Sequence, residues 1–94
     1  MVTIKDLSPI TPRTNGTRSL SAIKNIARHH SATTSGNWES FWRYWHGTNG
    51  WGTGGYHEII LRDGTVELCY DPTEITNGVG GQNSYIYHIS LNYR

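Results

Sequence analysis

Two adjacent histidines, His29 and His30, end a short and mostly apolar segment that begins at Ile23. Neutral imidazole is a good ligand for zinc, and a β-strand fixes the direction of the side chains that it carries. Because neighbouring side chains on a strand point to opposite faces, only one of the two histidines faces a given pocket. Such a pair is more often a hydrogen-bonded structural feature than a metal site, so the residues around it decide its interpretation.

Those residues form three blocks in a fixed order, namely 29–33, 55–67 and 82–89. In order and spacing the blocks resemble zinc-dependent N-acetylmuramoyl-L-alanine amidases of the type-2 family. That family includes many phage endolysins and, more distantly, the peptidoglycan recognition proteins. The resemblance extends from about Ile23 to the end of the chain.

The resemblance implies two site residues. His29 matches the first zinc ligand of the family, at the start of the motif His-[His/Asn/Cys]-Ser-Ala, and Tyr56 matches a tyrosine that assists catalysis beside the zinc in many members. Zinc in such hydrolases has three protein ligands and one open position, which lowers the pKa of bound water to roughly 7. The later ligands of the family come after the last matched block, so His29 is the only ligand that the resemblance places.

The remaining metal-binding side chains have simpler structural interpretations. His57 is interpreted as a packing or supporting residue, His30 as a packed residue that faces away from the site, and His46 as a surface residue in the last turn of a helix. Cys69 belongs to no metal-binding spacing. His57 and His88 lie on strands expected beside that of His29, so they or a second copy of the chain are open as ways to complete a metal site.

The chain divides into an irregular N-terminal arm, residues 1–20, and an amidase-like segment, residues 21–94. Residues 23–30 are expected to form a strand. Asn37 is a good N-cap for a helix that starts near Trp38, and Gly47 is expected to end that helix as a C-cap glycine. Four aromatic residues at helical spacing predict a stripe that packs on the sheet, namely Trp38, Phe41, Trp42 and Trp45.

Residues 56–70 have the pattern of a β-hairpin with Asp63-Gly64 as a two-residue turn. That turn pairs Ile59 with Leu68 and places Glu67 at a solvated position on the other face. A last strand is expected over residues 85–93. The predicted fold class is therefore α/β, a mixed β-sheet with a packed aromatic helix, as an incomplete type-2 amidase fold.

Composition narrows the possible functions. A length of 94 residues suits one small domain, and a net charge of +1 without a basic stripe argues against nucleic-acid binding. No apolar segment is long enough for membrane insertion, and the start of the chain lacks the apolar core of a signal peptide. We therefore expect synthesis in the cytoplasm without a signal peptide, and action at the bacterial cell wall if the protein is active.

The leading functional hypothesis is the N-terminal part of a phage or prophage N-acetylmuramoyl-L-alanine amidase. By resemblance it would use Zn to hydrolyse the amide between muramic acid and L-alanine in bacterial peptidoglycan. The alternative is a catalytically silent peptidoglycan-binding module, or an inactive fragment that lacks the later zinc ligands. Absence of the C-terminal part of the fold would uncover one face of the sheet, so we expect a homo-oligomer or a partner chain to cover it.

Overall fold

A computed structural model describes residues 2–30, 36–78 and 83–92. Its elements in chain order are β1 (Ile4–Asp6), the short helix η1 (Leu20–Ala22), β2 (Asn25–His30), α1 (Trp38–Gly47), β3 (Glu58–Ile60), β4 (Val66–Leu68), the short helix η2 (Asn83–Tyr85) and β5 (Ile86–Leu91). The expected end of the last strand at Tyr93, and the Ser-Ala part of the histidine motif, lie outside the described residues.

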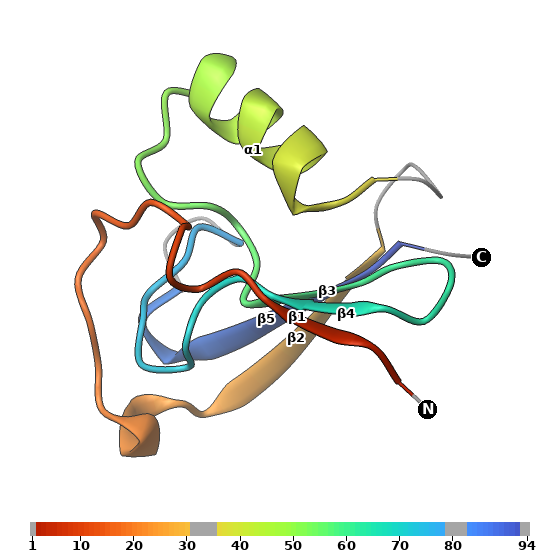
Figure 1. Cartoon of the computed structure of the whole chain (residues 1–94). Helices are drawn as coiled ribbons and strands as arrows, with labels where there is room; N and C mark the ends of the chain where they lie inside the picture. Colours follow the sequence, from red (N-terminus) through yellow and green to blue (C-terminus); the bar gives the residue numbers. More distant parts are fainter. Residues whose placement is uncertain (1, 31–35, 79–82, 93–94) are drawn as a thin grey trace.

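The five strands form one sheet in the order β1-β4-β3-β5-β2. Strands β3 and β4 are antiparallel, and the other neighbouring pairs are parallel. Helix α1 lies over one face of this sheet (Figure 1). The predicted α/β architecture, a mixed sheet with one packed helix, is therefore confirmed. None of the helices among the described residues is both long and apolar enough to cross a membrane.

Helix α1 begins where its sequence predicts. The side chain of Asn37 accepts a hydrogen bond from the Ser40 amide at 3.0 Å, and the Asn37 amide donates to Ser40 Oγ at 3.0 Å. This reciprocal capping box satisfies two backbone groups that a helix start leaves unpaired. The helix ends at Gly47 as expected, but its C-cap is Thr48, and Gly47 does not adopt the positive φ of a C-cap glycine.

The aromatic stripe of α1 forms the core against the sheet, as predicted. Trp38 and Trp45 are buried, and they pack with Ile59 of β3 and with Tyr70. Trp38 meets the Tyr70 ring edge-on at a centroid distance of 5.6 Å. Aromatic side chains of this size contribute much of the buried apolar area in a small domain, which explains how a chain with few aliphatic residues keeps a core.

The hairpin forms, but its predicted register is wrong by one residue. Ile59 pairs with Glu67 rather than with Leu68. The reason is the turn: the Leu61 amide donates to Thr65 O, so three residues rather than two form the loop, and Gly64 takes a positive φ of 90°. A three-residue turn of this kind ends on a residue in the left-handed conformation, which glycine adopts without strain.

This shift moves Glu67 to the helix-facing side of the sheet, because a slip of one residue reverses every side chain of a strand. Glu67 is 5% exposed, so its interpretation as a solvated residue is wrong. Its Oε1 accepts a hydrogen bond from the backbone amide of Trp38 at 2.8 Å. A carboxylate at this position also matches the positive end of the helix dipole, so Glu67 fixes the start of α1 to β4.

The N-terminal arm packs along the rest of the chain. Thr11 Oγ1 donates a hydrogen bond to Cys69 O at 2.6 Å. Arg18 donates to Pro72 O at 2.9 Å through Nε and to Asn83 O at 3.0 Å through Nη1. The arm therefore ties the region after β4 to the start of η2.

The face of the sheet opposite α1 is apolar and only partly covered. We call it the open face, and its apolar members are Ile4, Ile26, Ile60, Val66, Leu68, Tyr87, Ile89 and Leu91. None of these eight side chains is buried, and Ile4 and Ile26 are 61% and 67% exposed. Among the described residues α1 is the only α-helix, and it lies on the other face (Figure 1).

We predict that Glu67→Ala lowers the free energy of unfolding by about 1–3 kcal/mol, because it leaves the buried Trp38 amide without an acceptor. Chemical denaturation followed by tryptophan fluorescence measures this change. Glu39→Ala is the matched control, because Glu39 is an exposed carboxylate in the first turn of the same helix. Equal losses in the two variants would contradict the capping role of Glu67.

Candidate functional site

The structure brings His29 and Tyr56 together beneath α1. Their ring centroids are 5.0 Å apart, although they come from β2 and from the loop before β3. His88 of β5 completes the cluster, with its Nδ1 2.9 Å from Nε2 of His29. His29 is half-buried, whereas His88 is fully buried. We call these three residues the His29 cluster.

Strand pairing explains why the cluster faces the helix. His29 pairs with Ser90 of β5, and Ser90 pairs with Ile59 of β3, which lies in the core under α1. Paired residues share a face of the sheet, so His29 points to the same side as Ile59. His88 lies two residues before Ser90 and therefore shares that face.

Tyr56 is placed by the helix and by a bulge. Its ring contacts Phe41 and Trp45 of α1 at centroid distances of 5.9 and 5.2 Å. Cys69 and Tyr70 both donate a backbone hydrogen bond to His57 O, which is the pattern of a β-bulge. A regular strand through residues 56–60 would place Tyr56 on the same face as Glu58, but Tyr56 lies on the helix side, because the regular alternation of β3 begins only after this bulge.

The environment of Tyr56 keeps its phenol neutral. Burial raises the pKa of Tyr56, and a side-chain hydrogen bond with Ser90 partly offsets that rise. A neutral phenol beside His29 is a hydrogen-bond donor at physiological pH. Donors of this kind stabilise a negative oxygen that forms during attack on a carbonyl group.

His88 is held on several sides. Its Nε2 lies 2.9 Å from Oδ1 of Asn83, and its backbone amide donates to Nδ1 of His57 at 3.0 Å. Burial is the main cause that lowers the pKa of His88 to about 4, and the nearby His29, His57 and Arg18 contribute smaller parts of that decrease. The ring is therefore neutral at pH 7. From the sequence, His88 is expected on a strand beside that of His29, but the shared face of the two side chains follows only from the pairing of β2 with β5.

His57 is a packing residue, as predicted. Its Nδ1 accepts the His88 amide, so its Nε2 carries the proton and donates to Glu74 O at 2.8 Å. The ring stacks on Tyr87 at a centroid distance of 4.6 Å, on the side away from Tyr56. Burial lowers the pKa of His57 to about 4, against a smaller opposing effect of the hydrogen bond to Glu74.

The other candidates lie outside the cluster. His30 faces away from it, as expected, but it is exposed rather than packed. His46 is exposed at the end of α1 and stacks on Trp42 at 4.9 Å. Cys69 is fully buried, and burial raises the pKa of its thiol, so it is not a thiolate ready to bind metal.

A complete metal site does not occur within the described residues. No group of three or more histidine, cysteine, aspartate or glutamate side chains there is arranged to hold a metal ion. His29 itself suits a metal, because it is a half-buried imidazole with one nitrogen outside the hydrogen bond to His88. Structural and catalytic zinc sites use at least three protein ligands, so the described residues do not form such a site by themselves.

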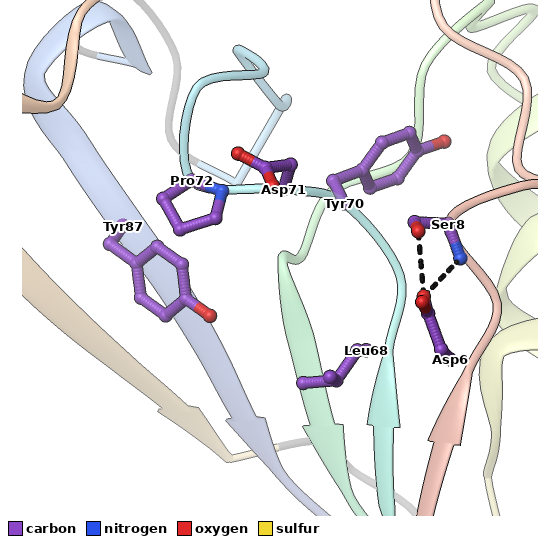
Figure 2. Close-up of a pocket in the computed structure, with 7 residues that line it drawn as sticks. All are labelled: Asp6, Ser8, Leu68, Tyr70, Asp71, Pro72 and Tyr87. Carbon is purple, nitrogen blue, oxygen red and sulfur yellow. Dashed lines mark hydrogen bonds between the residues drawn. The ribbon is translucent and has the colours of Figure 1, made fainter.

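A separate hollow of about 240 Å³ lies where β1, β4 and β5 approach the loop after β4. Figure 2 shows its lining residues, Asp6, Ser8, Leu68, Tyr70, Asp71, Pro72 and Tyr87. Hydrogen bonds from Ser8 lower the pKa of Asp6, and hydrogen bonds from Thr73 lower the pKa of Asp71. The hollow contains no member of the His29 cluster.

Comparisons with known proteins support the sequence resemblance. No family model matches the chain. The endolysins of Klebsiella phage KP32 and Enterobacteria phage K11 are each 50% identical to it over 42 residues, which is 45% of this chain and 28% of each endolysin. The matched segment is therefore a minor part of those relatives.

Solved structures share the fold. Bumblebee PGRP-SA matches with a TM-score of 0.79 and 20% identity, over 97% of this chain and 60% of that protein. The Ph2119 endolysin of a Thermus scotoductus bacteriophage matches with a TM-score of 0.77 and 22% identity, over 94% of this chain and 59% of that protein. The N-acetylmuramoyl-L-alanine amidase LysC of Clostridium intestinale matches with a TM-score of 0.69 and 22% identity, over 95% of this chain and 58% of that protein. These matches confirm the predicted fold, and the chain spans about three-fifths of each of these structures.

We predict that acid destabilises the fold through His57 and His88. Their pKa values fall from 6.5 to about 4 on folding, so the unfolded chain takes up protons first as the pH drops. The free energy of unfolding is thus highest above pH 6.5 and decreases between pH 6.5 and 4, by on the order of 2 kcal/mol per group. Urea unfolding at pH 7 and pH 4.5 measures the difference. The control is His46→Gln, a change at an exposed histidine, which should leave this pH dependence unchanged. Equal stability of the wild-type protein at the two pH values would contradict the prediction.

Proposed function

We propose that this chain is the part of an N-acetylmuramoyl-L-alanine amidase that contains the His29 cluster, and that it acts on bacterial peptidoglycan. The observation that carries the proposal is the contact between His29 and Tyr56, the two residues that the sequence resemblance assigns to the site. The endolysin and amidase relatives support the same class of activity. If the chain is active, its place of action is the bacterial cell wall.

The proposed reaction is hydrolysis of the amide between muramic acid and L-alanine. Tyr56 donates a hydrogen bond to the carbonyl oxygen as negative charge develops on it, which favours the transition state over the substrate. His29 holds one ligand position for zinc through its free ring nitrogen. Zinc bound there, together with ligands outside the described residues, would supply a Lewis acid and a water of lowered pKa.

The second candidate is a peptidoglycan-binding module without catalytic activity. It is favoured by the lack of a three-ligand metal group within the described residues. Such a module would bind peptidoglycan but would release no product. The two candidates make different predictions for the same set of variants.

For the enzyme, we predict that the chain sediments with purified peptidoglycan and releases soluble peptides in the presence of zinc. His29→Ala should abolish the release of peptides, because it removes a ligand of the metal. The same variant should bind peptidoglycan with an affinity within about twofold of the wild type, because the metal ligand acts on the reaction rather than on binding. Tyr56→Phe should slow release by roughly 10²–10³-fold, because it removes one donor to the developing oxyanion. Chromatography of the soluble peptides and their new amino termini measures release.

His30→Ala is the matched control, since His30 adjoins His29 but is exposed on the opposite face. This variant should bind and release as the wild type does. Binding without release by the wild type would support the silent module. A wild type that neither binds peptidoglycan nor releases soluble peptides would contradict both candidates.

We also propose that the open face associates with a second copy of the chain. Its eight apolar side chains lie at partly or largely exposed positions, and monomers rarely present a patch of this kind to water. Sedimentation velocity at micromolar concentrations should therefore show concentration-dependent dimers. Ile26→Lys should shift the protein toward monomer, whereas Tyr44→Lys, a change at an exposed residue of α1, should not. A wild-type monomer at these concentrations would contradict the proposal.

A further inference from the structure

A chain of three polar side chains leads from η2 to the candidate metal ligand. Asn83 Oδ1 lies 2.9 Å from His88 Nε2, and His88 Nδ1 lies 2.9 Å from His29 Nε2. Both ring nitrogens of His88 and Nε2 of His29 therefore each face one partner. The pattern matters because a neutral imidazole has one donor and one acceptor nitrogen, and its partners decide which is which.

The direction of the hydrogen bonds follows from Asn83. An amide oxygen only accepts, so Nε2 of His88 carries a proton and donates it to Asn83 Oδ1. His88 is fully buried and has no carboxylate partner in the described part of the chain, so its ring stays neutral and its Nδ1 is an acceptor. Nε2 of His29 must then carry a proton and donate it to His88 Nδ1.

His88 itself has little freedom to turn. A Cβ atom at Gly78 would overlap the His88 ring, so the Gly78 backbone lies directly against that ring. His57 holds the backbone on both sides, because it accepts from the His88 amide and its own amide donates to His88 O at 2.9 Å. The His57 and His88 rings are nearly parallel, at an angle of 11°. The acceptor that faces His29 is therefore rigidly placed.

The remaining nitrogen of His29 is left with its lone pair. Nδ1 of His29 has no hydrogen-bond partner among the described residues, and no buried side-chain nitrogen or oxygen there lacks one. Nδ1 is therefore a nitrogen that solvent reaches. Ligand histidines in metal sites commonly donate their other ring N–H to a fixed acceptor, which sets both the tautomer and the orientation of the ring.

We propose that His88 is a positioning residue that holds His29 in its Nε2–H tautomer and thereby presents Nδ1 as the metal-binding nitrogen. His88 does not bind the metal itself. This inference rests on the proposed function in so far as His29 serves as a ligand. The placement of the proton on His29 is independent of any metal or substrate. The positioning role of His88 and the metal-binding role of His29 can therefore be tested separately.

The first test uses the chain without metal. Long-range ¹H–¹⁵N correlation spectra of histidine-labelled protein at pH 7 distinguish the two tautomers of each ring. We expect His29 and His88 both to be protonated at Nε2 and unprotonated at Nδ1. A His29 ring that is protonated at Nδ1, or that populates both tautomers, would overturn the positioning role.

Two variants separate positioning from simple packing. His88→Leu removes the acceptor, and Asn83→Ala removes the partner that orients His88 without changing a buried ring. In either variant we expect the ratio of His29 tautomers to move toward Nδ1–H by about five- to tenfold, as for the loss of one hydrogen bond. His30→Gln is the control and should leave that ratio unchanged. If His88→Leu does not fold, Asn83→Ala decides, and an unchanged ratio in that variant overturns the proposal.

The second test adds zinc ions alone and follows the same ¹⁵N resonances. We expect zinc to shift Nδ1 of His29 most strongly, and Asn83→Ala to weaken the apparent affinity by about 10-fold or more. A shift centred on Nε2 of His29 or on His88 would overturn the assignment of the ligand atom. A wild-type chain that takes up no zinc at His29 would overturn the metal-binding part of this inference and of the proposed function, while the tautomer spectra still decide the positioning part.

Discussion

One row of paired residues crosses the whole sheet and sets the position of the site. From one edge to the other its members are Lys5, Glu67, Ile59, Ser90 and His29. Because paired residues share a face, all five point toward α1. Glu67 holds the start of the helix, Ile59 forms its core contact, and His29 meets the tyrosine that the helix aromatics hold in place. A change of register anywhere along this row would separate the helix from the site.

The site depends on neutral histidines as much as on placement. His57 and His88 are buried beside Arg18, and burial keeps both rings uncharged at neutral pH. An uncharged His88 accepts a hydrogen bond from His29 through Nδ1, whereas a protonated His88 carries a proton on both ring nitrogens and cannot accept. Burial, usually a matter of stability, here also fixes which nitrogen of His29 is available for chemistry.

Local signals made much of this fold predictable. Asn37 and the aromatic spacing defined α1, and the three matched blocks brought His29 and Tyr56 to one site. The hairpin register was not predictable from Asp63-Gly64, because that dipeptide fits two- and three-residue turns alike and the choice reverses the face of Glu67. The role of His88 depends on pairing between β2 and β5, a contact between distant parts of the chain that no local pattern encodes.

The central claim is that the fold presents Nδ1 of His29 to a metal ion while His88 holds Nε2. The most direct measurement is a crystal structure of this chain grown with zinc, with anomalous data at the zinc edge. The account predicts an anomalous peak about 2.0–2.1 Å from Nδ1 of His29, with the hydrogen bond to His88 intact. A peak bound to Nε2, or none at His29, would contradict it.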